Sequence, residues 1–139
     1  MNHFRPADPE DAPVLAAMNQ QLIRDEGHRN RMTLPELTAR MQKWLAGESH
    51  AVVFEHNGAI AGYALYRLEL DHVYLRQLFV DNAHRRQGIA RAAIAWLREN
   101  PWKAMTRIRV EVLIGNRTGI EFWHAVGFED YSMTMELER

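Results

Sequence analysis

The stretch Val73–Val80 constrains the fold of this chain more than any other. It is almost wholly apolar, which is typical of a strand that is buried on both faces of a sheet. After a polar loop, Ile89, Ala93 and Leu97 recur at the spacing of an amphipathic helix, and Asn100-Pro101 ends that helix because proline disfavours helical backbone before it. The sequence therefore predicts a sheet with helices packed on it.

The remaining patterns predict the other elements in order. Alternating or apolar runs predict strands near residues 3–5, 51–55, 59–67, 107–114 and 131–137, and helical spacing predicts two helices before residue 47 and one over 116–126. The capping box from Thr33 to Glu36 and the hairpin signal Asn57-Gly58 are the clearest local features. The predicted order is β-α-α-β-β-β-α-β-α-β, a mixed sheet flanked by helices.

Length, charge and composition narrow the classes of protein. The 139 residues predict a single domain over residues 1–139, with no internal repeat or linker. With 17 basic and 18 acidic residues the net charge is −1, which argues against a nucleic-acid-binding protein. The sequence holds no cysteine, which excludes disulfides, thiolate metal sites and a cysteine nucleophile. Without an apolar run of membrane-spanning length or an apolar leader at the N-terminus, we expect a cytoplasmic protein that binds no membrane.

The stretch from Val80 to Arg91 carries the strongest chemical signal. A buried strand ends, a basic loop follows, and Gly88 stands where a helix begins. Backbone N–H groups at a helix start have no partner within the helix, so this bend suits a phosphate or pyrophosphate group. The alternative is a helix start whose arginines are only solvated. The motifs G-x-G-x-x-G and G-x-x-x-x-G-K-[ST] are absent, and the histidines show no metal-ligand spacing, so we expect no metal.

These residues resemble a known family. The run Arg85-Arg86-Gln87-Gly88-Ile89-Ala90 resembles the Q/R-x-x-G-x-G/A motif of the GNAT superfamily of acyl-CoA-dependent N-acetyltransferases. The preceding Leu78-Phe79-Val80 looks like the central strand of that family, and Asn116 with Phe122–Phe128 is similar to its closing segment. The resemblance covers essentially the whole chain. It implies a mostly antiparallel mixed sheet flanked by helices, and an enzyme that transfers an acetyl or short acyl group from acetyl-CoA to a primary amine.

The resemblance also implies roles for individual residues. Backbone amides from Gln87 to Arg91 would hold the pyrophosphate of coenzyme A, while the backbone of Leu78–Val80 would pair with the pantetheine arm. An amide near Val80 would polarise the thioester carbonyl, and Asn116 would contact the arm. The residues expected to bind the cofactor are Leu78, Phe79, Val80, Arg85, Arg86, Gln87, Gly88, Ile89, Ala90, Arg91, Asn116 and Trp123.

The sequence departs from the family pattern at Trp123. Many members have a tyrosine there that protonates the leaving thiolate. An indole N–H donates a hydrogen bond but is no acid near neutral pH. Because a thiol with a pKa of about 8.5 is a tolerable leaving group, we expect departure without an acid or with water. Trp123 serves either core packing or cofactor contact.

The acceptor amine requires a base, because an alkylamine with a pKa of about 10.4 is protonated at neutral pH. We favour Glu26 and His28 as the catalytic residues, because they lie in the polar stretch between the first two helices, which lines the acceptor site in this family. The other candidates precede the central strand: Glu69, Asp71 and His72.

Two other functions compete with acetyl transfer. The first is a coenzyme A-binding module without catalysis, which the tryptophan at position 123 favours. The second treats residues 85–98 as a DNA-recognition helix, which the neutral charge opposes. The sequence leaves the acceptor open among small amines, amino acids, antibiotics and protein amines. Because family members often dimerise, a homodimer is expected.

Overall fold

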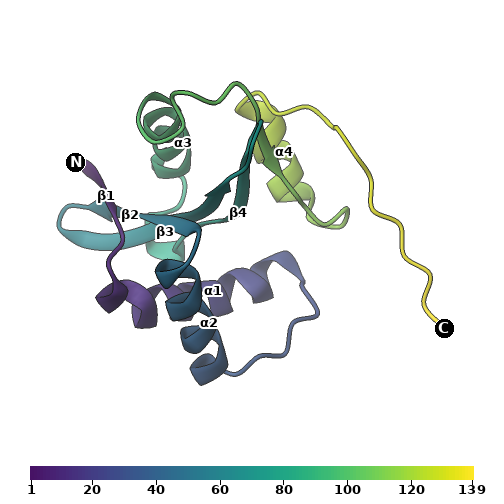
Figure 1. The fold of residues 1–139 in the computed structure, drawn as a ribbon, viewed down its shortest axis with the longest axis horizontal. Coiled ribbons are helices and arrows are strands. Elements are labelled where there is room, and N and C mark those ends of the chain that lie inside the picture. The colour runs from purple at the N-terminus through teal and green to yellow at the C-terminus, as the bar shows by residue number, and fades with distance from the viewer.

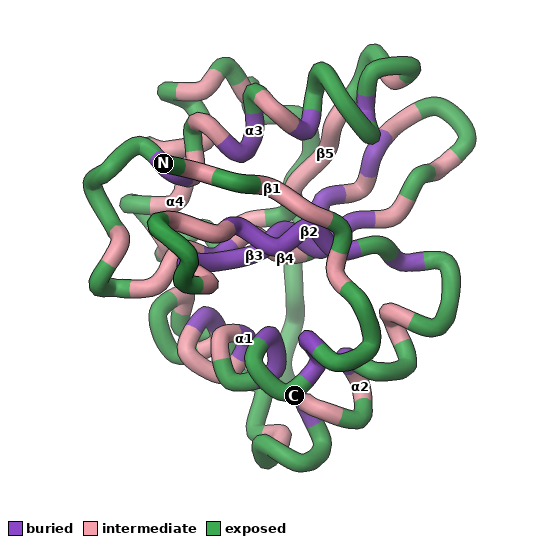
Figure 2. The backbone as a smooth tube through the Cα atoms, turned by 90° about the vertical axis from the view of Figure 1, so that its left-hand side faces the viewer, coloured by how far each residue is buried: buried purple, intermediate pink, exposed green.

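The computed structural model describes residues 1–139, and its centre is a five-stranded sheet in the order β1-β2-β3-β4-β5 (Figure 1). Helices α1 and α2 cover one face of the sheet and α3 covers the other, as the turned view also shows (Figure 2). The elements are β1 (Asn2–Pro6), α1 (Ala12–Glu26), α2 (Leu34–Ala46), β2 (Ser49–His56), β3 (Ala59–Leu68), β4 (Val73–Val80), α3 (Ile89–Glu99), β5 (Ile108–Val110) and α4 (Arg117–Ala125), with short 3₁₀ turns at Pro9–Asp11 and Asn82–His84.

The predicted element order is confirmed from the first strand to the last helix. Strands β1 to β4 pair antiparallel in sequence order, and β5 joins the edge of β4 in parallel. Several local signals are confirmed as well. The Thr33 hydroxyl accepts from the Glu36 amide while the Glu36 carboxylate accepts from the Thr33 amide, and Asn57 and Gly58 both have positive φ in the β2–β3 turn.

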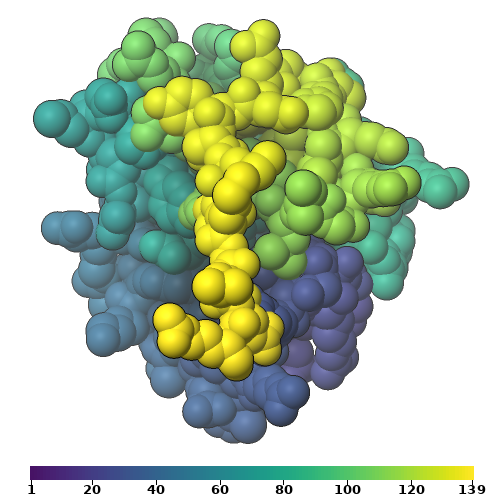
Figure 3. All heavy atoms as spheres, turned by 90° about the vertical axis from the view of Figure 1, so that its right-hand side faces the viewer, coloured from purple at the N-terminus to yellow at the C-terminus, as the bar shows by residue number.

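Two strand predictions need correction. The strand expected over 107–114 is only Ile108–Val110, and the strand expected over 131–137 is absent. Tyr131, Met133, Met135 and Leu137 are between 70% and 87% exposed. The C-terminal segment extends outward from the layers of the fold (Figure 1) and lies in front of them in the turned view (Figure 3), and it forms no strand. Alternation of apolar residues shows which side of a strand would be buried. It does not show whether the fold has a free strand edge with which the segment can pair.

A bulge in β4 changes which face of the sheet its side chains lie on. Leu65 pairs with Gln77 whereas Tyr66 pairs with Leu75, so Arg76 is the extra residue in β4. In a regular strand Leu75 and Phe79 would lie on the same face. Here Leu75 packs in the apolar cluster under α3, while Phe79 packs in the cluster under α1 and α2. The bulge therefore reverses the alternation of side chains in the second half of β4. Odd-numbered residues face α3 before the bulge, as Leu75 does, and face α1 and α2 after it, as Phe79 does.

Candidate active site

The bend before α3 has the geometry of an anion-binding loop. Arg86 and Gly88 both adopt left-handed backbone, with φ of 64° and 73°. Gly88 caps α3 without any side-chain hydrogen bond, and the backbone N–H groups from Gln87 to Arg91 donate to no carbonyl or side chain. A run of free amides at a helix start carries a partial positive charge and suits a phosphate oxygen. The amides that the sequence predicted to hold pyrophosphate are thus free to do so.

The arginines around this bend have different neighbours. The Arg85 guanidinium donates to the Asp25 carboxylate at 2.6 Å and to the Val80 carbonyl at 2.8 Å, so it ties the bend to α1 and β4. Arg91 reaches the Ala125 carbonyl at 3.4 Å, next to α4. Arg86 is exposed and makes no hydrogen bond or ion pair. Of the predicted phosphate-binding arginines, Arg86 is therefore the one with a free side chain, while Arg85 chiefly positions the loop.

The second half of β4 has an unpaired edge. Strand β5 pairs with β4 only from Val73 to Leu75, and the two strands separate beyond that point. Leu78, Phe79 and Val80 pair with β3 on their other side. Their free edge leads directly to the anion-binding bend, so an extended arm could add to the sheet there while its charged end reaches the amides. The fit with the arm and pyrophosphate of coenzyme A rests on these two unpaired sets of backbone groups.

Gly62 on β3 allows this arrangement. A methyl group added to Gly62 would lie 2.0 Å from the Phe79 carbonyl oxygen and 3.0 Å from the Cα of Val80. Only a residue without a side chain lets β3 approach the end of β4 so closely. The position and direction of the free β4 edge therefore depend on this glycine.

Asn116 and Trp123 lie on or next to α4. The Asn116 Oδ1 accepts from the Gly119 amide at 3.0 Å, so this side chain caps the helix. Trp123 is half-buried and packs edge-on against Phe122 and Phe128, with ring centroids 5.0 and 5.1 Å away. It also packs against the core cluster under α3. Both residues thus have structural roles here; the contact with a cofactor expected of each stays a prediction.

Glu26 and His28 come together at the end of α1. The His28 Nε2 lies 2.9 Å from the Glu26 Oε1. Burial raises the pKa of the Glu26 carboxyl above its ordinary value, while the neighbouring His28 opposes that shift. Gly27 with φ of 72° ends the helix between them and lets the chain turn back. A carboxylate with a raised pKa, hydrogen-bonded to an imidazole, is a suitable proton acceptor.

This pair lines a cavity of about 560 Å³, within the range of small-molecule sites. The cavity lies between α1, α2, the middle of β4 and the segment after β5, and Arg40, Trp44, Arg76 and Gln77 also line it. The buried Tyr63 hydroxyl donates to the Gln77 Oε1 at 2.7 Å beneath it. Because Gln77 directly precedes Leu78, the cavity adjoins the free edge of β4.

The other base candidates lie outside this cavity. Glu69 pairs with Arg67, and His72 pairs with Asp71, in the turn between β3 and β4. Sequence reasoning missed Arg40 and Arg76 as residues of the cavity. A signal for Arg76 was present, since it is a charged residue within an otherwise nearly apolar strand.

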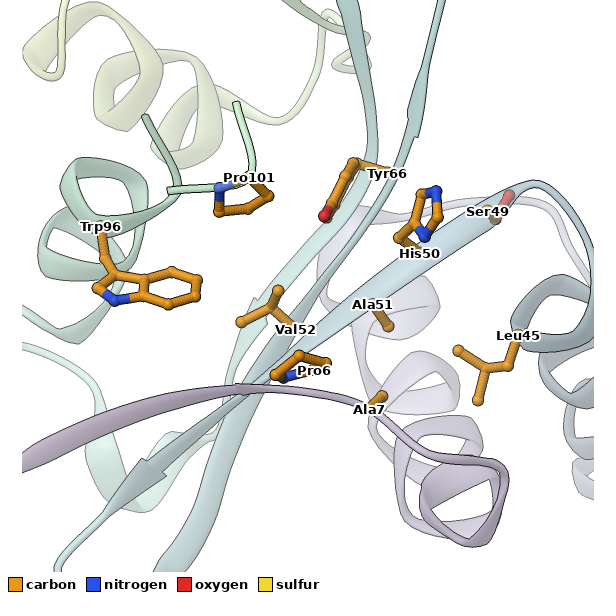
Figure 4. A pocket seen from close by; sticks show the side chains of 10 residues that line it. All are labelled: Pro6, Ala7, Leu45, Ser49, His50, Ala51, Val52, Tyr66, Trp96 and Pro101. Carbon is orange, nitrogen blue, oxygen red and sulfur yellow. The ribbon is translucent and has the colours of Figure 1, made fainter. Parts of the chain in front are cut away.

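A smaller cavity of about 300 Å³ lies elsewhere (Figure 4). Pro6, Val52 and Tyr66 line it from the sheet, Trp96 lines it from α3, and Pro101 lines it from the turn that follows the helix. It lies where β2 begins and β3 ends, whereas Gly62, which pairs with Val80, lies near the opposite end of β3. It holds no carboxylate and no free helix amides, so it lacks the features of the larger site. No group of three or more potential metal-binding side chains exists, and no helix has the length and apolarity needed to span a bilayer.

The fold and the site define the class of protein. The mixed sheet, the separation of β4 and β5 and the amide-lined bend agree with the resemblance found in the sequence. The family model described as acetyltransferase (GNAT) matches residues 16–128, so the chain belongs to this family. Membership confirms the predicted family and acetyl-CoA as the co-substrate.

Solved structures confirm the fold. A possible acetyltransferase from Clostridium difficile 630 is 15% identical, with a TM-score of 0.85 over 100% of this chain and 97% of its own. The aminoglycoside N-acetyltransferase AAC(6')-Iy in complex with CoA is 16% identical, with a TM-score of 0.80 over 100% and 95%. A ribosomal-protein-alanine N-acetyltransferase from Brucella melitensis is 14% identical, with a TM-score of 0.79 over 100% of both chains. A search of curated proteins found no match.

Proposed function

We propose that this acetyltransferase moves the acetyl group of acetyl-CoA to a primary amine that binds in the cavity beside β4. The observation that carries the proposal is the run of free amides from Gln87 to Arg91 at the end of the unpaired β4 edge. These groups suit a pyrophosphate and an extended arm, and the cavity with Glu26 and His28 adjoins them. Bound acetyl-CoA supplies the acetyl group as a thioester.

The residues of the chain act mainly on protons and charge. The Glu26–His28 pair takes a proton from the acceptor ammonium, which frees the lone pair of the nitrogen for attack. A backbone amide near Val80 donates to the acetyl oxygen as negative charge develops on it. Trp123 is no acid, so the thiolate departs unassisted or takes its proton from water. We expect the catalytic residues to be Glu26 and His28.

Two measurements on the purified protein test this proposal. Calorimetric titration with acetyl-CoA reports binding, and release of free thiol in the presence of an amine panel reports transfer. The proposal expects binding and amine-dependent thiol release. Binding without any amine-dependent release would instead support a coenzyme A-binding module, and no binding at all would contradict both.

We also propose that the protein is a homodimer in which the C-terminal segment of each copy pairs with the other. The support is a one-sided apolar strand pattern, at Tyr131, Met133, Met135 and Leu137, that has no partner within its own chain. β5 also has only one neighbour in the sheet. Each copy thus has an unpaired C-terminal segment and an unpaired β5 edge. In a two-fold dimer the C-terminal segment of each copy would pair with the β5 edge of the other.

Sedimentation equilibrium tests the dimer. The wild type should have twice the mass of the chain at micromolar concentration, and a variant with Met133→Lys and Met135→Lys should sediment as a monomer while still binding acetyl-CoA. A monomeric wild type at high concentration would refute the exchange.

A further inference from the structure

Two guanidinium groups lie against the same tryptophan in the cavity. Arg40 and Trp44 are one turn apart on α2, and the Arg40 guanidinium lies 4.4 Å from the centre of the Trp44 ring. Arg76, the extra residue of the β4 bulge, places its guanidinium 5.2 Å from the same ring. All three residues line the cavity that holds Glu26 and His28. An indole ring stabilises a cation over its face, so it keeps both groups in place.

Neither guanidinium has an anionic partner within the chain. Arg40 makes one hydrogen bond, from Nη2 to the amide oxygen of Asn19 at 2.9 Å, and its Nε is buried without an acceptor. Arg76 makes no hydrogen bond or ion pair and is exposed to the cavity. Burial lowers the pKa of Arg40, and repulsion from Arg76 adds a smaller effect in the same direction. Since a buried donor without an acceptor is unfavourable, an anion that reached these groups would be bound.

The other charges of the cavity have partners within the single chain. Arg29 at the rim donates twice to the Glu136 carboxylate, at 2.9 and 2.7 Å, and an exchange of the C-terminal segment that broke this pair would only add to the positive charge. The Glu26 carboxylate is hydrogen-bonded to His28. The cavity therefore presents an unbalanced positive charge on the side of α2 and β4, and a proton acceptor on the side of α1. A polycationic acceptor would meet repulsion from Arg40 and Arg76.

We propose that the acceptor is a small amine that also carries a carboxylate, which binds to Arg40 and Arg76 while its amine faces Glu26 and His28. This inference rests on the proposed acetyl transfer. In the reaction the amine nitrogen bonds to the acetyl carbon and the C–S bond of the thioester breaks. The ammonium loses two protons, one to the Glu26–His28 pair and one that ends on the departing thiolate.

The experiment compares matched acceptors. Thiol release from acetyl-CoA is measured with the L-amino acids, with their carboxamides, and with spermidine and kanamycin as cationic amines. Tripeptides with a free or an amidated C-terminus show whether the carboxylate belongs to a free amino acid or a peptide. We expect at least one carboxylate-bearing acceptor whose kcat/KM is about tenfold or more above that of its carboxamide.

The variants Arg76→Gln and Arg40→Gln locate the preference. Each should raise the KM for the carboxylate acceptor by about ten- to hundredfold, with little change for its carboxamide or in the KM for acetyl-CoA. Arg98→Gln, an exposed arginine in the last turn of α3, is the control that should change neither. Arg76 is exposed, so its variant keeps the test valid if Arg40→Gln fails to fold.

Several results would overturn the inference. Equal rates with carboxylates and carboxamides, a preference for spermidine or kanamycin, no transfer to any carboxylate-bearing amine, or a preference that survives Arg76→Gln would each contradict it. These outcomes differ from a failure of the proposed function, in which acetyl-CoA would not bind or no amine of any charge would accept the acetyl group.

Discussion

Replacement of Gly88 by alanine separates backbone strain from cofactor binding. Gly88 has a φ of 73°, and a methyl group added there would meet nothing within 4 Å. The substitution therefore introduces conformational strain without a clash, about 1–2 kcal/mol for left-handed backbone. The bend can relax by rotating out of this conformation, which turns the Gly88 and Ile89 amides away from the site. Binding must then restore the strained form.

The magnitude follows from that strain. If binding reverses all of it, the Kd for acetyl-CoA rises by about five- to thirtyfold, since 1.4 kcal/mol is about a factor of ten. Any part of the strain that the unliganded bend retains lowers Tm instead, by about 3–7 °C if all of it is retained, given the entropy of unfolding of a 139-residue chain. Both changes are measurable, by calorimetric titration with acetyl-CoA and by thermal unfolding.

Gly58→Ala is the matched control. Gly58 also has positive φ, 85°, and open space around its Cα, but it lies in the β2–β3 turn. It should lose a similar amount of stability while its Kd for acetyl-CoA stays within about twofold of the wild type. If Gly88→Ala lost almost no Tm, so that its bend had relaxed, and still bound acetyl-CoA as tightly as Gly58→Ala does, the bend would not be the anion-binding site.

Three further predictions concern the site and its support. Glu26→Gln should lower kcat/KM for the amine by about a hundredfold or more and abolish the acidic limb of the pH–rate profile, which lies above the ordinary glutamate pKa because burial raises the pKa of Glu26. Between the ordinary and the raised pKa of Glu26, the folded state binds more protons than the unfolded state. As pH rises through the raised pKa, the unfolding free energy of the wild type should therefore fall relative to that of Glu26→Gln. If denaturant unfolding showed the same pH dependence for both proteins, the pKa of Glu26 would not be raised. Trp123→Tyr should leave kcat largely unchanged in steady-state assays, whereas a hundredfold increase would show that an acid was limiting. Gly62→Ala should cost about 1–3 kcal/mol in urea unfolding and weaken acetyl-CoA binding, because the new methyl would lie 2.0 Å from the Phe79 carbonyl oxygen; an unchanged Kd would separate β4 from the binding site.

The sequence predicted those parts of the fold that local patterns determine. Helix ends depend on residues such as Thr33 and Gly27, and strand faces depend on alternation, so the order from β1 to α4 could be predicted. The C-terminal strand could not, because pairing requires an edge that only the tertiary structure, or a second copy, provides. The same limit hid the bulge at Arg76, which arises from the register between β3 and β4.

The candidate site divides in the same way. The bend at Gly88 is local, so its free amides could be predicted from a strand, a basic loop and a glycine. Glu26 and His28 are two residues apart, and their contact follows from the turn at Gly27. Arg40 and Arg76 come from a helix and a strand far apart in sequence, and Trp44 brings them together. No local pattern links such residues, because their proximity depends on how α2 packs on the sheet.

A crystal structure of this chain with acetyl-CoA tests the central claim most directly. We expect pyrophosphate oxygens within hydrogen-bond distance of the backbone nitrogens from Gln87 to Arg91, and the pantetheine arm along the unpaired edge of Leu78–Val80. A ligand bound elsewhere, such as in the cavity between Pro6 and Pro101, with the amides of the Gly88 bend still free, would contradict the account.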